Sequence, residues 1–276
     1  MSETYAIELK NITKRFGKVT ANDKVCLSVK KGEILSILGE NGSGKTTLMN
    51  MISGIYYPDE GQILVNGKEV TIRSPKDSFA LGIGMIHQHF KLVDVLTAAE
   101  NIILGLPGKE VLDMKSVAAK INELTSRYGF DLDPNQKIYT MSVSQKQTVE
   151  IVKVLYRGAD ILILDEPTSG QDGHEKKMLM RLMESLQQRG ITIILVTHDM
   201  DIVARDCTRV IVIASHKVAF DGRPEELFSA KNRPEDWGLL YPASVLLGRK
   251  LPGAPYCRDM DSFCRTFIAL KGEGAL

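Results

Sequence analysis

Near the amino terminus, one segment combines residue types and a spacing that suit phosphate chemistry. It fits G-x-x-x-x-G-K-[ST] and reads Gly39-Glu40-Asn41-Gly42-Ser43-Gly44-Lys45-Thr46. Glycines let the backbone turn tightly and bring its amide groups close to a polyphosphate, and a following helix adds positive potential at its N-terminus. The Lys45 amine then reaches the β- and γ-phosphates, and the Thr46 hydroxyl ligates magnesium. The segment predicts a polyphosphate site made of Gly39, Asn41, Gly42, Ser43, Gly44, Lys45, Thr46 and Thr47.

The residues on either side of this loop predict the elements that hold it. Residues 34–38 are rich in β-branched side chains and leucine, and residues 47–52 are patterned as a helix. The order is therefore strand, glycine loop and helix, as a phosphate loop requires. Thr47 stands where a dinucleotide-binding fingerprint needs its third glycine, which excludes that alternative.

A second set of polar residues falls at the predicted carboxyl ends of strands, where open α/β sheets place their chemistry. The apolar run Ile161–Leu164 is continuous, as in a parallel strand buried on both faces, and it ends in Asp165 and Glu166. Gln88 and His198 follow two further predicted strands. Taken singly, the acidic pair can cap a helix and His198 can belong to a strand-to-helix turn. Together with the glycine loop, these groups favour one site.

Each of these residues has an expected role in phosphoryl transfer. Asp165 is expected to hold magnesium, directly or through water. We expect Glu166 to orient and polarise an attacking water opposite the γ-phosphate. His198 is expected to contact the γ-phosphate, and Gln88 to sense the metal and the water.

The remaining patterns predict an α/β protein in which a parallel-sheet core of the P-loop NTPase type carries two subdomains. Residues 5–31 alternate with period two and predict an N-terminal antiparallel β subdomain. The Asn66-Gly67 dipeptide predicts a hairpin turn. Helical spacing from residue 93 to 157 predicts a helical subdomain, inserted between the P-loop strand and the next core strand. We expect one domain over residues 1–232 and an extension over 233–276, which either packs on the core or serves in dimerisation.

Composition narrows the classes of partner and compartment. A formal net charge of +1 gives no electrostatic reason to expect nucleic acid or an anionic membrane surface as the main partner. Neither a membrane-spanning apolar run nor a signal peptide is visible, so the chain is expected to be cytosolic and soluble by itself. The cysteines lack metal-ligand spacing and are expected to be reduced and mostly structural. A metal site at His87 and His89 is the less favoured interpretation.

From Tyr5 to Phe228 the chain resembles the ATP-binding cassette (ABC) ATPases. The resemblance implies ATP and Mg²⁺ as cofactors, Walker A at residues 39–46, Walker B at residues 161–165 and a D-loop at residues 169–172. It also implies catalytic roles for Lys45, Gln88 (the Q-loop glutamine), Glu166 and His198 (the switch histidine), with Thr46, Gln88 and Asp165 around the magnesium ion. Phe16 becomes the adenine-stacking aromatic residue, although its setting alone favours a strand-end core residue.

The signature segment departs from the family pattern Leu-Ser-Gly-Gly-Gln. It reads Met141-Ser142-Val143-Ser144-Gln145, so that Ser144 replaces the second glycine. The resemblance implies that two cassettes clamp two ATP molecules head to tail, each site being completed by the partner's signature. Ser142 can still bond a γ-phosphate, but the Cβ of Ser144 limits close backbone approach. One good and one impaired site would result if the partner is a different chain.

Two segments of the chain resemble the ATPases of two different groups of importers. Residues 74–93 look like ATPases of simple-sugar and nucleoside importers, which usually carry two cassettes in tandem, whereas no second P-loop is found here. Residues 169–228 look more like ATPases of energy-coupling-factor importers for vitamins and metal ions.

The expected function is an ATP-hydrolysing subunit that drives solute import from the cytoplasmic face of the cell membrane. Its expected partners are integral membrane subunits and a second ABC ATPase chain, identical or different. A soluble cassette protein without transport and a weakly hydrolysing regulatory subunit are the alternatives. The transported solute stays open, because its pocket would lie in other polypeptides.

Overall fold

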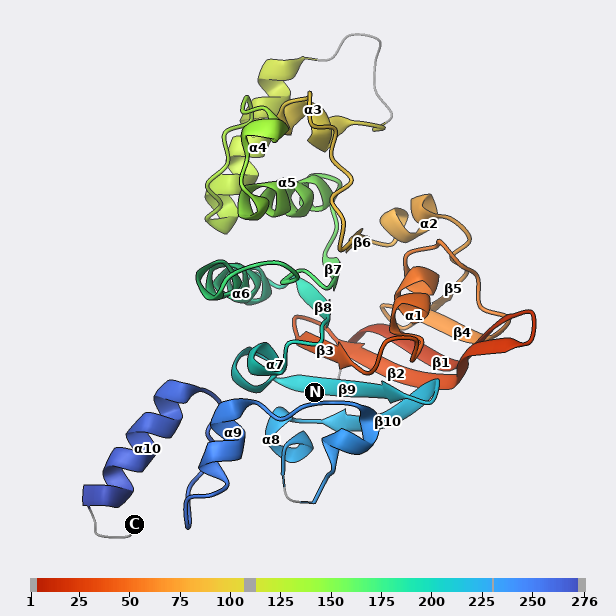
Figure 1. Cartoon of the computed structure of the whole chain (residues 1–276). Helices are drawn as coiled ribbons and strands as arrows, with labels where there is room; N and C mark the ends of the chain where they lie inside the picture. Colours follow the sequence, from red (N-terminus) through yellow and green to blue (C-terminus); the bar gives the residue numbers. More distant parts are fainter. Residues whose placement is uncertain (1–3, 107–112, 230, 273–276) are drawn as a thin grey trace.

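The computed structural model describes residues 4–106, 113–229 and 231–272 and contains two β-sheets (Figure 1). The first is antiparallel, with the strand order β2-β1-β4-β5. It consists of β1 (Tyr5–Phe16), β2 (Val19–Lys30), β4 (Glu60–Val65) and β5 (Lys68–Val70). Asn66 and Gly67 both have positive φ, 52° and 75°, and join β4 to β5 in the predicted hairpin. The predicted N-terminal antiparallel structure is confirmed.

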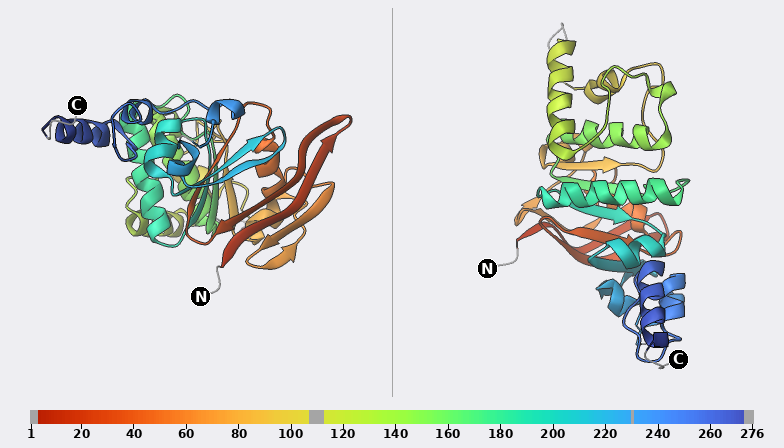
Figure 2. Two further views of the ribbon diagram at one scale, coloured as in Figure 1. Left: turned by 90° about the horizontal axis from the view of Figure 1, so that it is seen from below. Right: turned by 90° about the vertical axis from the view of Figure 1, so that its left-hand side faces the viewer.

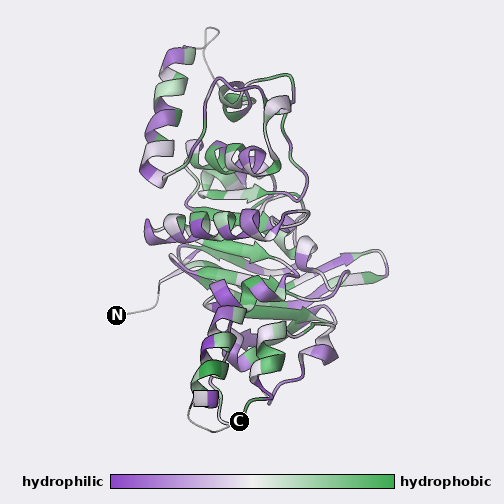
Figure 3. Ribbon diagram, turned by 60° about the vertical axis from the view of Figure 1, so that its left-hand side comes forward, coloured by the Kyte–Doolittle hydropathy of each residue, from purple (hydrophilic) through white to green (hydrophobic). Residues whose placement is uncertain are grey.

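The second sheet has six strands in the order β10-β9-β3-β8-β7-β6. They are β3 (Ile34–Leu38), β6 (Ile83–Ile86), β7 (Ile161–Asp165), β8 (Thr192–Val196), β9 (Arg209–Ala214) and β10 (Lys217–Gly222). All of them run parallel except β10, which pairs antiparallel with β9. Every residue of β3, β7 and β8 is buried, which explains their continuous apolar sequence. Figure 3 shows the hydrophobic colouring concentrated on these central strands.

Register brings the chemistry-bearing ends of three strands to the same edge. Val196, the last residue of β8, pairs with Ile37 of β3 on one side and with Asp165 of β7 on the other. Helix α1 (Lys45–Ile52) follows β3 after the glycine loop. Helix α2 (Pro75–Ala80) begins at Ser74 with a complete capping box.

A helical layer follows β6 and precedes β7. It contains α3 (Ala98–Ile103), α4 (Met114–Tyr128), a 3₁₀ turn (Ile138–Thr140) and α5 (Val143–Tyr156), which share an apolar cluster of their own. The predicted helices are confirmed. The expected point of insertion is wrong in one detail: the layer follows the edge strand β6 and not the P-loop strand, because β6 itself belongs to the six-stranded sheet.

The carboxyl-terminal third contains α6 (Gly173–Gln188), α7 (Met200–Asp206), α8 (Pro224–Leu227), a 3₁₀ turn (Pro234–Trp237), α9 (Ala243–Gly248) and α10 (Met260–Gly272). Leu239 and Val245 are buried with Phe228 and with residues of β9, so this part of the extension packs on the core. Helix α10 has no buried residue and projects from the body (Figure 2). Within the described residues, no helix combines the length and the apolar character needed to cross a membrane.

Candidate functional site

The glycine loop between β3 and α1 depends on glycine for two separate reasons. Gly39, Gly42 and Gly44 have φ values of 147°, 82° and 102°, which L-residues rarely adopt. A Cβ on Gly39 would collide with the carbonyl oxygen of Ile213, and one on Gly44 with that of Ala21. A Cβ on Gly42 would meet no atom within 4 Å. Gly39 and Gly44 therefore allow the loop to pack, whereas Gly42 leaves its outer side open to an approaching group.

The amine of Lys45 is folded back into this loop. Its Nζ donates to the carbonyl oxygens of Gly39 (2.7 Å) and Glu40 (2.8 Å), and the residue is 7% exposed. Burial lowers the pKa of this amine, while the charges of Glu166 and Asp165 act in the opposite direction. The amine is thus held beside the carboxylates, at the start of α1.

Asp165 is the last residue of the buried strand β7, and Glu166 follows it directly. Asp165 is 9% exposed; burial raises its pKa, the like charge of Glu166 adds to the rise, and Lys45 opposes it. Glu166 has a φ of 49°, and its amide donates to Val196 O at 2.9 Å. A side-chain-bearing residue pays roughly 1–2 kcal/mol for this left-handed conformation. Such strain commonly lies at functional sites, and here it sets the direction of the Glu166 side chain.

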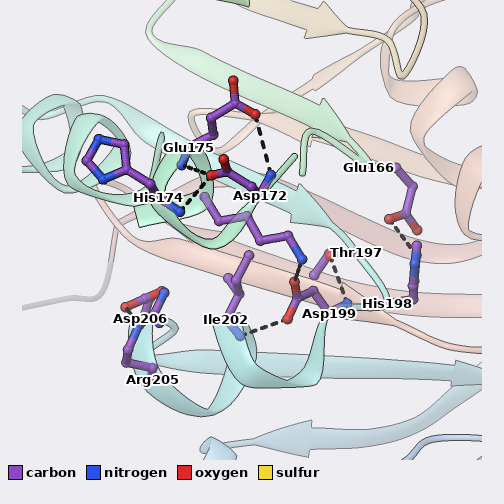
Figure 4. A network of polar contacts seen from close by, with 11 residues as sticks. Glu166, Asp172, His174, Glu175, Thr197, His198, Asp199, Ile202, Arg205 and Asp206 are labelled. Carbon is purple, nitrogen blue, oxygen red and sulfur yellow. Dashed lines mark hydrogen bonds and ion pairs between the residues drawn. The ribbon is translucent and has the colours of Figure 1, made fainter. Parts of the chain in front are cut away.

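His198 faces Glu166 from the end of β8. Its Nδ1 lies 2.7 Å from Oε2 of Glu166, while the histidine side chain is 74% exposed (Figure 4). The next residue, Asp199, caps α7 by accepting from the Ile202 amide and pairs with Lys176 at 2.6 Å. The predicted strand-to-helix turn and the predicted site therefore coexist, since Asp199 makes the turn and leaves His198 free to face the carboxylate.

A cavity of about 960 Å³ lies against Glu166 and His198. Among its lining residues are Gly39, Asn41, Gln88, Glu166 and His198, which come from the loops after β3, β6, β7 and β8. The structure thus brings the predicted strand-end residues together at one edge of the sheet, as the sequence led us to expect.

Lys45, Thr46 and Asp165 are not in the lining of this cavity, and neither are Phe16, Ser142 and Ser144. Phe16 ends β1, is 44% exposed and packs edge-on against Tyr56 at 5.1 Å between ring centroids. Ser142 caps α5 through a box with Gln145. Ser144, in the first turn of α5, lines a different cavity of about 440 Å³ between α5 and α6. Their roles toward ATP stay predictions.

The extension supplies one wall that sequence reasoning missed. Residues 238–243 line the same cavity as Glu166 and His198. Gly238, with a φ of 68°, lies so close to the Glu40 side chain that a Cβ there would collide with the carboxylate. Trp237 lines a smaller cavity with residues 41–43 of the glycine loop. A glycine after a tryptophan gives no signal for such a contact, because the two segments are about 200 residues apart.

The residues around the loop fit a magnesium–triphosphate complex. The buried Ser43 hydroxyl has no hydrogen-bond partner among the described residues, and the Thr46 side chain is exposed at the start of α1. The described residues contain no cluster of three or more His, Cys, Asp or Glu side chains that could hold a metal by themselves. Magnesium usually binds through one or two carboxylates together with substrate phosphates, which matches Asp165 beside a phosphate loop.

Comparison with known proteins identifies the family. The ABC transporter family model matches residues 22–169. The nucleoside import ATP-binding protein NupA of Lactococcus lactis subsp. cremoris is 50% identical over 222 residues, covering 79% of this chain and 43% of the relative. The guanosine import ATP-binding protein NupO of Bacillus subtilis is 49% identical over 215 residues, covering 77% and 42%. This chain thus spans less than half the length of both relatives.

A solved structure extends the likeness to three dimensions. CbiO1 of Clostridium perfringens, part of the ABC transporter complex CbiONQ, superposes with a TM-score of 0.73 at 31% identity, covering 83% of this chain and 92% of that one. The residues matched by the family model include the glycine loop, β7 and the residues between them. The chain belongs to the ABC transporter family.

Proposed function

We propose that this chain binds Mg·ATP and hydrolyses it to ADP and phosphate as the nucleotide-binding subunit of an importer. The supporting observation is the convergence of Gly39, Gln88, Glu166 and His198, from the loops after four different strands, on one cavity. The Lys45 amine is bound to the Gly39 carbonyl oxygen beside it. We also propose the division of the chain into a cassette over residues 1–232 and an extension over 233–276.

The proposed roles follow from the chemistry of each side chain. The loop amides and the Lys45 amine would bind the β- and γ-phosphates. Thr46, Asp165 and Gln88 would hold the magnesium ion, which would supply positive charge to neutralise the phosphates. Glu166 orients the attacking water and accepts its proton. His198, held 2.7 Å from Glu166, contacts the γ-phosphate and fixes the carboxylate.

A second cassette completes the proposed site. Ser142 lies on α5, in the helical layer, and does not line the cavity of its own chain. A head-to-tail partner would bring its own Ser142 over the γ-phosphate, as the family resemblance implies. Both an identical and a different second chain satisfy this geometry.

The proposed setting is the cytoplasmic face of the cell membrane, with integral membrane subunits as further partners. Two relatives near 50% identity are named for nucleoside and guanosine import, so a nucleoside is the solute class that we favour. Vitamin or metal-ion import, the second group that the sequence resembles, is the alternative.

The signature segment favours one alternative, a weakly hydrolysing regulatory subunit. Ser144 occupies an ordinary helical position in α5, and the Thr148 hydroxyl donates to its carbonyl oxygen at 3.1 Å. Replacing Ser144 by glycine removes the Cβ that limits approach to a phosphate, so hydrolysis should rise if this position impairs the site. An unchanged rate after Ser144→Gly would dismiss the impairment.

The deciding experiment is extraction of the tagged full chain from native membranes in mild detergent. The expected result is co-purification with multi-span membrane proteins, ATP hydrolysis by the complex, and uptake of radiolabelled nucleoside that stops when the gene is deleted. Recovery without membrane proteins would reject the importer proposal and leave only the question of ATP hydrolysis. Uptake of a different solute would correct the proposed class.

A further inference from the structure

The main chain that leaves the site after Gln88 is held by side chains of α5. The Lys91 amide donates to Oε1 of Glu150 at 2.8 Å, and the Lys91 carbonyl oxygen accepts from Nζ of Lys153 at 3.2 Å. Glu150 and Lys153 also face each other, with Oε2 and Nζ 3.8 Å apart. Both polar groups of one peptide residue, three positions after Gln88, are thus bound by one charged pair.

A second attachment lies two residues further along. Oδ1 of Asn101, on α3, accepts from the Val93 amide at 2.7 Å, and its Nδ2 donates to the Val93 carbonyl oxygen at 3.1 Å. Asn101 is fully buried. The segment from Lys91 to Val93 is therefore attached to two helices of the helical layer, and Figure 1 shows this stretch rising from β6 past α5 toward α3.

Stabilising the fold does not by itself explain the buried Glu150–Lys153 ion pair, because burying two charges costs desolvation free energy. Glu150 is 8% exposed, and burial lowers the pKa of the Lys153 amine, with Glu150 opposing that shift. Desolvation of a buried pair can exceed its Coulombic gain, so well-packed apolar residues would stabilise such a contact at least as well. What an apolar pair cannot do is bind both the amide and the carbonyl oxygen of a loop residue.

Helix α5 also carries the signature at its other end. Ser142 is the N-cap of α5, and Glu150 lies about two turns further along the same helix. Since α5 is a continuous helix, a displacement of its N-terminus is transmitted to the residues that bind Lys91.

We propose that Glu150 and Lys153 are positioning residues for Gln88, which fix the main chain behind it and tie its position to that of α5. This inference rests on the proposed ATP hydrolysis at the same site. It predicts that closure of a partner over the signature helix and placement of Gln88 at the metal and water are linked through Lys91.

The test is a double-mutant cycle in the full chain, purified in its native complex. We expect Glu150→Ala to lower kcat by about 10-fold, because displacing a positioning group by about 1 Å can cost up to about 100-fold. The dissociation constant for ATP should change less than about 2-fold, since no ATP-binding residue is removed. Glu150→Gln should recover most of the rate, because its amide oxygen still accepts from the Lys91 amide.

The decisive arm is the Gln88→Ala background. If Glu150 acts through Gln88, adding Glu150→Ala to the Gln88→Ala protein should lower kcat by less than about 2-fold. The reason is that the effects of two substitutions do not add when one residue acts through the other. An additive 10-fold loss in that background would overturn the inference. If Glu150→Ala does not fold, Lys153→Met is carried through the same cycle.

Glu33 provides a matched control. Its Oε1 accepts from the Lys30 amide at 2.6 Å and lies 3.2 Å from Nη1 of Arg209, so it makes the same kinds of contact just before β3, at the opposite edge of the sheet. Glu33→Ala should lower stability yet leave the Gln88 cycle unchanged.

Hydrogen exchange gives an independent readout. The Lys91 amide should exchange faster in Glu150→Ala than in wild type, and near the wild-type rate in Glu150→Gln. Equal protection in all three proteins would reject the attachment itself. Absence of ATP hydrolysis by the wild-type complex would instead reject the proposed function, so the two failures are distinguishable.

Discussion

Replacing Glu166 by glutamine tests the proposed chemistry at its centre. The substitution keeps the size and the left-handed backbone of residue 166 and removes the group that accepts a proton. General bases contribute about 10²- to 10⁴-fold in rate, which corresponds to about 2.7–5.4 kcal/mol of the activation barrier. We expect kcat to fall within this range.

Binding of ATP should survive the same substitution. Glu166 adds to the raised pKa of Asp165 through its like charge, and it places negative charge where a triphosphate would bind. Removing that charge therefore relieves repulsion and should leave affinity equal or higher. The lost pairing with His198 involves a largely exposed side chain, so the free energy of unfolding should change by less than about 1 kcal/mol.

The assay is release of inorganic phosphate by the purified complex at saturating Mg·ATP, alongside equilibrium binding of ATP and thermal melting. Glu184→Gln, on the exposed face of α6, is the control and should match wild type in all three. A fall in kcat of less than 10-fold would refute the role of Glu166 as general base. A fall of the expected size accompanied by loss of ATP binding would indicate a damaged site and not a missing base.

Three further predictions address the loop, pH and the thiols. Gly44→Ala should lower the free energy of unfolding by roughly 2–4 kcal/mol, because its Cβ collides with a backbone carbonyl, whereas Gly42→Ala should cost about 1–2 kcal/mol for its φ alone; urea denaturation compares them. Burial, aided by Lys91, lowers the pKa of His87, so the folded chain resists protonation and should lose stability as the pH falls below about 6.5, by at most about 1.4 kcal/mol per pH unit. Melting curves of wild type and His87→Gln at several pH values should therefore diverge on acidification, and parallel curves would contradict this. Burial raises the pKa of the Cys207 thiol to about 12, so maleimide should label exposed Cys26 in the native protein and reach Cys207 only after unfolding, as peptide mass spectrometry can show.

The strand-end residues were predictable because their signals are local. A parallel strand that is buried on both faces has a continuous run of apolar residues, so β7 can be recognised from the sequence. The residue that follows it must lie at the carboxyl edge of the sheet. The same reasoning placed Gln88 and His198 without knowledge of strand order. The glycine loop was predictable as well, because three glycines within six residues before Lys45 suit a backbone that turns tightly.

Contacts between distant segments could not be predicted in this way. The packing of Gly238 on Glu40 and the binding of the Lys91 peptide by Glu150 depend on which loops the fold brings together, and neither leaves a periodic pattern. The insertion point of the helical layer was misjudged for a related reason. A strand before Gln88 was predicted, but the pattern of a four-residue strand such as β6 does not show that its neighbour in the sheet is β7.

The geometry also indicates which part of the site is left for a partner to control. Glu166 and His198 already lie 2.7 Å apart within one chain, and the Lys45 amine is already bound by a carbonyl oxygen of its loop. The positions of these three residues therefore do not depend on a second cassette. Gln88 differs, because it is exposed in the loop after β6 and the main chain behind it is bound to the helix that carries Ser142. If the proposed second cassette presses on the helical layer, we expect the position of Gln88 to change first. Control of hydrolysis should accordingly appear as a change in how well the metal and water are positioned, and thus in kcat, before it appears as a change in ATP affinity.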